Sequence, residues 1–516
     1  MSRAPYSHHE VVDAVVIGTG AGGAPLTARL AKAGLSVVAL EAGRSFVPDD
    51  HVADELAADI YWMEERLSGG ADPTAFGSNN SGMGVGGSTL HWGAFCPRPD
   101  ARDLQLKSLT GQGADWPIPH AELIAYVEEV EAFTGVSGPA DYPWDASRRY
   151  AYPPVPRNAS ADAMARGCEA MGITATDAPA ALVSRDRDQP YWGQRQACVN
   201  CGTCHQGCRN AAKTSMDTSY LPFAVAHGAE VRSQARVLSF DLDHEGRITG
   251  VVYHQDGEER RQRCRTVFLC AGGVESPRLL LNLGLANSSG QVGRNFMAHV
   301  ATQVWGRFDD EMRMNRGYPS SLITEDMMRP AEAGCAGGYL IQSLGVLPVN
   351  LATQLARGAG MWGTRLQSLL RQYNHMAGIG INGECLPHPD NRLTLSDETD
   401  AFGHRKARID FSYHENERAI DRHSRQVMTA IWEAAGAQDI FAIDRSAHTI
   451  GTCRMGGNGD EAVVDADGRS FDIANLWICD NSIFPSALAA NPALTIMALS
   501  LRTADRFLAL SKARAA

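Results

Sequence analysis

The chain has 516 residues, which at roughly 100–200 residues per domain is enough for more than one domain. Apolar residues make up 44% of it and charged residues 21%, a balance that is ordinary for a globular enzyme and excludes a disordered chain or a disulfide-stapled miniprotein. The 59 acidic residues outnumber the 47 Lys and Arg residues, and the net charge of -12 repels a nucleic-acid backbone. We therefore expect no nucleic-acid partner.

The N-terminal segment carries no pattern of a secretory signal, and no run of about 18 uncharged apolar residues predicts a membrane span. We expect a cytoplasmic protein, or alternatively a periplasmic one that is exported with a signal-bearing partner subunit.

The first predicted elements form a strand, turn, helix and strand in succession. The apolar run 11–17 predicts a buried parallel strand, and a helical pattern runs from the glycine segment 18–23 to Ala33. A second apolar strand, 35–40, then ends at Glu41. In this context the GxGxxG pattern of the glycine segment predicts dinucleotide binding.

Each residue of that motif has a physical task. Gly18 permits a tight turn, Gly20 lets a pyrophosphate approach the backbone at the positive end of the helix, and Gly23 lets the helix pack closely on the strand. Glu41 is predicted to accept hydrogen bonds from the ribose hydroxyls.

A long loop-like stretch, 44–92, contains a second glycine-rich segment at residues 82–89. Such a segment has too few side chains to build a core of its own, and we predict that it lies along the same cofactor. Gly86, Gly87 and Ser88 are its candidate contact residues.

The later elements predict a two-domain α/β fold. Residues 115–134 predict a capped helix. Strands at 230–240, 247–254 and 265–270, followed by a helix at 276–283, resemble the second half of a flavin-binding sheet. Strands at 378–384 and 408–413 and a helix at 415–435 belong to a predicted substrate-binding domain, residues 301–440, which is α+β and built on an antiparallel sheet. The buried strand 475–480 ends in Asp480 and returns to the first domain, residues 1–300 and 441–516.

Four of the 12 cysteines lie close together, within a cysteine-rich insertion at about residues 190–215. Their spacing, Cys198-x2-Cys201-x2-Cys204-x3-Cys208, equals the bacterial ferredoxin pattern and makes them candidate ligands of an iron-sulfur cluster. Arg209 stands where that pattern has proline, and no second run occurs. Disulfides, free structural thiols and a zinc site are the alternatives.

Six separated motifs, in order along nearly the whole chain, resemble the glucose-methanol-choline (GMC) oxidoreductase family, and more closely its bacterial sugar and polyol dehydrogenases than the fungal glucose oxidases. The motifs are residues 18–43, 85–92, 270–277, 292–295, 448–456 and 491–492. The resemblance implies a Rossmann-like FAD-binding domain. It also implies oxidation of a primary or secondary alcohol to a carbonyl by hydride transfer to flavin N5.

The resemblance implies roles for three further residues. His448 becomes the base, although a core histidine satisfied by backbone is the alternative interpretation. Asn491 becomes its partner beside the substrate hydroxyl. Pro492, which follows it, is a candidate cofactor contact. Asn491 also fits an N-cap of a helix at 493–510, and the two roles are compatible. His91 is expected to contact the flavin, with or without a covalent bond.

The sequence leaves alternatives open for the electron acceptor and for the class of reaction. With an iron-sulfur cluster, electrons would pass to a cytochrome or quinone, with a small or cytochrome subunit as partner; without one, oxygen could accept them, as in an oxidase. A flavin-bearing lyase of the same fold and a pure binding subunit of an electron-transfer complex are competing hypotheses.

Overall fold

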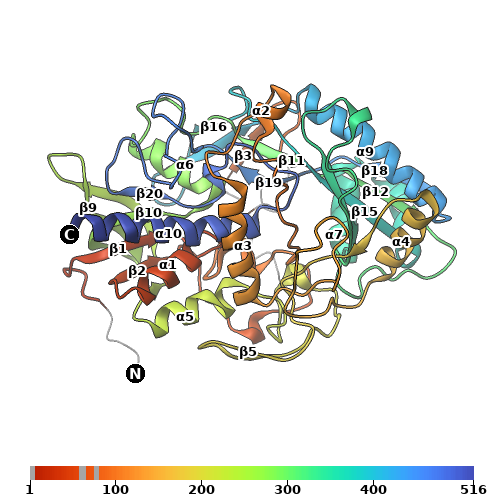
Figure 1. Cartoon of the computed structure of the whole chain (residues 1–516), viewed down its shortest axis with the longest axis horizontal. Coiled ribbons are helices and arrows are strands. Elements are labelled where there is room, and N and C mark those ends of the chain that lie inside the picture. Colours follow the sequence, from red (N-terminus) through yellow and green to blue (C-terminus); the bar gives the residue numbers. More distant parts are fainter. Residues whose placement is uncertain (1–5, 57–65, 75–80, 516) are drawn as a thin grey trace.

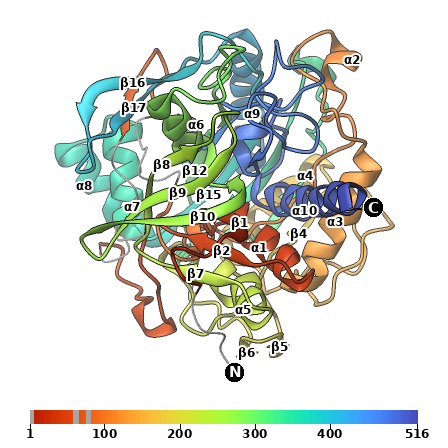
Figure 2. The ribbon, with the colours of Figure 1, turned by 90° about the vertical axis from the view of Figure 1, so that its left-hand side faces the viewer.

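Two β-sheets organise the molecule, and helices cover both of them (Figures 1 and 2). The structure is a computed structural model that describes residues 6–56, 66–74 and 81–515. It confirms the predicted α/β class, with a Rossmann-like sheet and a second, antiparallel sheet. No helix in these described residues is long and apolar enough to cross a membrane.

The first sheet has parallel strands at its centre. β1 pairs in parallel with β2 and with β10, and β20 joins β10 on the other side. Every residue of β2 is buried, because parallel strands covered on both faces have no exposed side. The strands in spatial order are β7 (Glu230–Arg232), β2 (Val37–Leu40), β1 (Val12–Ile17), β10 (Glu258–Leu269), β9 (Ile248–Gln255) and β8 (Arg236–Leu242), with β20 (Leu476–Ile478) beside β10.

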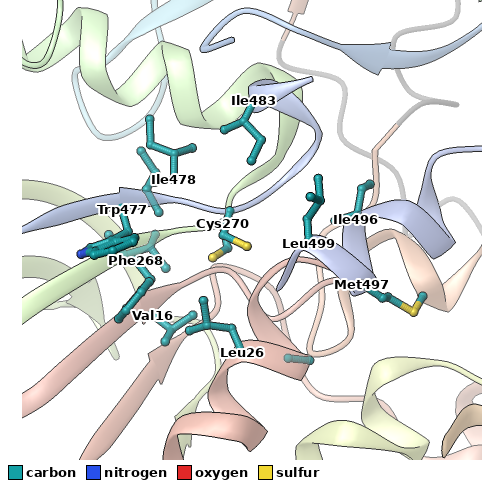
Figure 3. Packing of buried hydrophobic residues seen from close by; sticks show 14 of the residues in the cluster. Val16, Leu26, Phe268, Cys270, Trp477, Ile478, Ile483, Ile496, Met497 and Leu499 are labelled. Atoms are coloured by element: carbon teal, nitrogen blue, oxygen red, sulfur yellow. The ribbon is translucent and has the colours of Figure 1, made fainter. Parts of the chain in front are cut away.

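Helices α1 (Gly23–Lys32) and α10 (Ala493–Ala515) lie together on this sheet (Figure 1). Val16, Phe268 and Trp477 project from three neighbouring strands toward Leu26 of α1 and Leu499 of α10 (Figure 3). All five side chains are buried, so the first and last helices of the chain share one core. Helices α3 (His120–Thr134), α5 (Tyr220–Ala226) and α6 (Gly272–Leu283) complete this part of the molecule.

The second sheet is antiparallel throughout. Its order is β18 (Gln438–Ile443), β12 (Gln303–Arg307), β15 (Met376–Gly383), β14 (Tyr339–Leu344), β13 (Leu322–Thr324) and β4 (Thr176–Asp177), with β11 (Met297–Val300) pairing with β15 and with β19 (Ser446–Ile450). Helices α4 (Ala159–Met171) and α9 (Glu415–Ala434) cover one face, where Trp432 and Ile431 pack with Val304 and Ile379. The opposite face is left for the site described below.

Smaller elements surround these layers. They are the sheet of β3 (Arg66–Gly69), β16 (Arg392–Thr399) and β17 (Arg405–Asp410), the hairpin of β5 (Arg187–Gln189) and β6 (Gly193–Arg195), and helices α2 (Leu106–Thr110), α7 (Pro348–Thr353) and α8 (Gly363–Arg371).

One predicted strand is divided in the structure. The expected strand 230–240 is two strands, β7 and β8, which pair on opposite edges of the first sheet. The chain turns between them at Gln234, whose φ of 52° lies in the left-handed region. Hydropathy alone does not register such a turn, because the residues on both sides keep strand-like patterns.

Candidate functional site

A cavity of about 640 Å³ lies where the carboxyl ends of the parallel strands meet the open face of the antiparallel sheet. In α/β sheets this edge is the usual place for a bound ligand. Ten of the twelve residues predicted to be catalytic or cofactor-binding line the cavity: Gly18, Gly20, Glu41, Gly87, Ser88, His91, His448, Asp480, Asn491 and Pro492. Gly23 and Gly86 lie behind this wall and shape it.

The two glycine segments form a cradle that side chains would fill. A Cβ atom on Gly87, whose φ is 57°, would lie 2.6 Å from the Cα of Gly20. A Cβ on Gly18, whose φ is 96°, would lie 2.5 Å from the carbonyl oxygen of Cys270, and one on Gly23 would lie 1.9 Å from that of Gly18. The backbone approaches therefore require glycine, and they leave peptide groups bare along the cavity wall.

Glu41 ties these two segments together through Thr19, a residue that sequence reasoning did not single out. The Thr19 amide and hydroxyl both donate to Glu41 Oε2, at 3.0 and 2.8 Å, and the Gly43 amide donates to Oε1 at 3.0 Å. The Gly86 amide in turn donates to the Thr19 hydroxyl at 3.2 Å. Burial raises the pKa of Glu41. Its predicted contact with a ribose stays a prediction.

Asp480 holds the loop after β10 at the start of α6. Its Oδ2 accepts hydrogen bonds from the Gly272 amide at 2.8 Å and the Ser276 hydroxyl at 2.6 Å, and its Oδ1 accepts one from the Ser482 amide at 2.8 Å. Burial raises the pKa of this carboxyl group. Asp480 thus fixes two strand ends of the cavity wall relative to each other.

His448 lies in β19 and is hydrogen-bonded to a second histidine, His299 of β11. Their Nδ1 atoms are 2.9 Å apart, and His299 Nε2 lies 3.1 and 2.9 Å from the carbonyl oxygens of Ala487 and Leu488. Carbonyl oxygens only accept, so His299 carries its proton on Nε2 and presents an unprotonated Nδ1. The proton between the two rings therefore belongs to His448 Nδ1, which leaves the lone pair of His448 on Nε2.

Both histidines are neutral at neutral pH. Burial lowers the pKa of His299 to about 4. Burial, aided by nearby His299 and Arg445, holds the pKa of His448 well below its usual value of 6.5. His448 also has a φ of 63°, an uncommon conformation for a residue other than glycine and one that clusters at functional sites. Among the described residues, no hydrogen-bond partner contacts its Nε2.

Asn491 stands just before α10, with Pro492 between it and the helix. Its Oδ1 accepts a hydrogen bond from Asn382 Nδ2 of β15 at 3.0 Å. This contact occupies the amide oxygen and leaves the Asn491 NH₂ group as a donor beside the cavity. The contact with Asn382 orients the Asn491 side chain, and because an amide oxygen can accept two hydrogen bonds it stays compatible with the N-cap role.

The cysteine-rich segment packs against the loop that carries His91. His205 Nδ1 donates to the carbonyl oxygen of His91 at 2.9 Å, and the buried Lys213 ammonium donates to the carbonyl oxygens of Leu90 and Cys204 at 2.8 and 2.6 Å. Burial lowers the pKa of His91 to about 3 and that of Lys213 to about 8. One structural task of this segment is therefore to hold the His91 loop at the cavity.

The structure does not support the predicted iron-sulfur cluster on Cys198, Cys201, Cys204 and Cys208. Within the described ranges, which include all four, no group of three or more Cys, His, Asp or Glu side chains is arranged to hold a metal ion. The thiols of Cys198 and Cys208 donate to neighbouring Asn side chains, and Cys201 is exposed beside the Thr203 hydroxyl. Burial raises the pKa of the Cys204 thiol. The four are free thiols, one of the alternatives that the sequence left open.

Four residues of the site escaped sequence reasoning. Thr19 lies inside the glycine motif and His299 four residues after the 292–295 motif, so their positions offered a weak signal. Asn382 and Arg445, which also line the cavity, gave none, because only the pairing of distant strands brings them there.

Comparison with known proteins identifies the family. Residues 68–301 and 387–500 match the description GMC oxidoreductase. The chain is 29% identical to 2-methyl-1,2-propanediol dehydrogenase of Mycolicibacterium austroafricanum, over 96% of this chain and 94% of that one. It is also 29% identical to the fructose dehydrogenase large subunit of Gluconobacter japonicus, over 96% and 97%.

Solved structures agree in fold. Pyridoxine 4-oxidase from Mesorbium loti has a TM-score of 0.65 at 17% identity, covering 96% of this chain and 99% of that one. An Aspergillus oryzae formate oxidase variant has a TM-score of 0.67 at 15% identity, covering 98% and 100%. The resemblance expected from the six motifs is confirmed: the chain belongs to the GMC oxidoreductase family and is an oxidoreductase.

Proposed function

We propose that this protein uses FAD to oxidise a primary or secondary alcohol, such as a sugar or polyol, to the carbonyl compound, with His448 as base and Asn491 as its partner. The observation that carries the proposal is the hydrogen bond between His299 and His448. It leaves a basic nitrogen, His448 Nε2, on a residue of the cavity wall. The names of similar proteins, which include a propanediol dehydrogenase and a fructose dehydrogenase subunit, support an alcohol or sugar as substrate.

The residues around the cavity fit FAD. Bare peptide groups at Gly18, Gly20 and Gly87 and the N-terminus of α1 suit the phosphates, and Glu41 suits the ribose. Gly86, Ser88, His91, Asp480 and Pro492 are the further residues that we propose to hold it. When bound, FAD supplies an acceptor for the hydride that leaves the alcohol carbon.

His448 takes the proton of the alcohol at Nε2. The chain from the Leu488 carbonyl oxygen through His299 fixes the tautomer that His448 needs for this task. Burial lowers its pKa, so the base is ready without first losing a proton.

Asn491 orients the alcohol oxygen. With its Oδ1 engaged by Asn382, its NH₂ group donates to the oxygen as negative charge develops there. The N-terminus of α10 lies at the same place and adds the positive end of a helix dipole. One acceptor and one donor thus contact the reacting oxygen.

Anaerobic reduction of the enzyme-bound flavin by alcohols tests the proposal. Wild-type protein should lose its visible flavin absorbance on mixing, and His448→Ala should slow this step by about 10²–10⁴-fold. His244→Ala, which removes an exposed histidine, is the matched control and should keep the wild-type rate. Product formation with a flavin that never bleaches would instead identify a lyase.

The electron acceptor is decided by a second measurement. We propose that the reduced enzyme passes electrons to oxygen, a quinone or a cytochrome. Reoxidation in air that is as fast as turnover would identify an oxidase. Slow reoxidation in air with rapid turnover on a redox dye would identify a dehydrogenase.

A further inference from the structure

Arg445 is a cavity-lining cation without a counter-ion. It lies between β18 and β19, three residues before His448, and its backbone oxygen accepts a hydrogen bond from the Ala301 amide at 3.0 Å. Among the described residues, its guanidinium group has no ion-pair or hydrogen-bond partner, and burial lowers its pKa. A shielded guanidinium group with no partner is costly in a folded protein, and a ligand that brings negative charge removes this cost.

The acidic groups of the cavity are engaged elsewhere. Glu55 accepts hydrogen bonds from the Val349 and Asn350 amides at 2.8 and 2.7 Å, and Asp444, next to Arg445, is paired with Arg425. The remaining carboxylates of the wall also have partners: Glu41, Glu275 and Asp480. Of the other cavity arginines, Arg236 and Arg278 both pair with Asp400, and Arg357 is exposed.

A polar row across the second sheet lies at the same end of the cavity. Gln303 of β12 pairs with Gly380 of β15, which pairs with Gln342 of β14, so the three residues share one face of three neighbouring strands. All three line the cavity. The row ends at Ile443 of β18, two residues before Arg445.

Both glutamines have hydrogen-bonding capacity to spare. Gln342 Oε1 is buried without a hydrogen-bond partner in the part of the chain that the structure describes. Gln303 Oε1 accepts from the Trp305 indole at 3.3 Å, which leaves the Gln303 NH₂ group as a donor. Between them, Gly380 is packed closely, since a Cβ atom there would lie 2.9 Å from Leu344 Cδ1 and 3.3 Å from Gln303 Cγ. The two glutamines therefore offer one acceptor and one donor to the cavity, which suits a hydroxyl group.

We propose that the substrate is a hydroxy acid whose carboxylate binds Arg445 and whose further hydroxyl groups bind Gln303 and Gln342, while the reacting carbinol lies at His448 and Asn491. This inference rests on the proposed function and names its substrate class. A carboxylate matches the single charge and the forked donors of one guanidinium group.

The test compares aldonates with alditols of equal carbon number, which differ in carrying a carboxylate or a CH₂OH group at one end. For wild-type protein, kcat/KM for the aldonate should exceed that for the alditol by about 30-fold or more. Arg445→Gln should abolish this preference, and Arg445→Lys, which keeps the charge but loses the fork, should retain part of it. Arg371→Gln, which removes an exposed arginine of α8, is the control and should leave the ratio unchanged.

The outcomes separate this inference from the proposed function. A wild-type enzyme that prefers the alditol, or an Arg445→Gln ratio equal to that of the wild type, would overturn the hydroxy-acid assignment alone. If neither member of any pair bleaches the flavin, alcohol oxidation itself fails. FAD content shows whether Arg445→Gln is folded, and if it is not, the ratio for Arg445→Lys decides.

Discussion

His448 acts through a neighbour that sets its tautomer. The Ala487 and Leu488 carbonyl oxygens fix the proton of His299 on Nε2. His299 Nδ1 is then an acceptor, which fixes the proton of His448 on Nδ1. Neither contact is visible in the sequence, since His299 and Leu488 lie far from His448 along the chain. The family motif makes His448 the proposed base, and the fold decides which of its nitrogens carries the lone pair.

Replacing His299 tests this transmission. In His299→Leu, His448 loses the acceptor for its Nδ1 proton, and we expect the rate of anaerobic flavin reduction to fall by about tenfold to a hundredfold while KM changes little. His299→Gln restores an acceptor and should recover part of the rate. Equal rates for His299→Leu and wild type, each with a full complement of FAD, would contradict the role.

The pH dependence of kcat/KM follows from the lowered pKa of His448. Protonation removes the lone pair that accepts the alcohol proton, so activity is lost on the acidic side. Because burial holds this pKa well below 6.5, kcat/KM should be level from pH 8 to pH 6.5 and fall only under more acidic conditions. An acidic limb with its midpoint at or above 6.5 would show that the base is not this buried histidine.

Among the secondary-structure elements, the turn from β1 to α1 is tightly packed. A Cβ atom on Gly23 would lie 1.9 Å from a backbone oxygen and 3.2 Å from Val16 Cγ1. The sequence predicted this role of Gly23, and the observed spacing agrees with it. Hydropathy also predicted most strands and helices to within a few residues, because burial of one face or both faces dictates their pattern.

The free energy of unfolding of Gly23→Ala should be lower than that of the wild type by about 3 kcal/mol. The new Cβ would clash with the carbonyl oxygen of Gly18, which is a backbone atom and cannot rotate aside. Gly457→Ala is the matched control, because no atom lies within 4 Å of its Cβ position, and its free energy of unfolding should stay within about 0.5 kcal/mol of wild type. Chemical denaturation measures both. Equal stability of the two variants would show that the turn can relax.

Across the whole molecule, the cavity draws its walls from both sheets, from Gly18 after β1 to Gln342 in β14. A cofactor that binds such distant segments of the folded chain raises the free energy of unfolding by an amount set by its concentration relative to its Kd. Removal of FAD should therefore lower the melting temperature by several degrees, since a ligand at a hundred times its Kd contributes about 2.7 kcal/mol. Thermal unfolding with and without added FAD measures this change.

Acid precipitation of the FAD-bound protein shows how His91 contacts the flavin. We expect acid precipitation to leave FAD in the supernatant, as for a noncovalent contact. Flavin that stays in the pellet would establish a covalent bond, and its loss in His91→Ala would assign that bond to His91.

The sequence by itself predicted the glycine turn after the first strand and the family, because both depend on short motifs, and the family resemblance singled out His448 and Asn491 as candidates. It also suggested a metal cluster from cysteine spacing alone, and there it was misleading, since spacing does not show where sulfur atoms point or whether they are deprotonated. Only the tertiary structure decided that His299, Asn382 and Arg445 join the site. Strand pairing brings these residues together from separate parts of the chain, and no local pattern encodes that pairing.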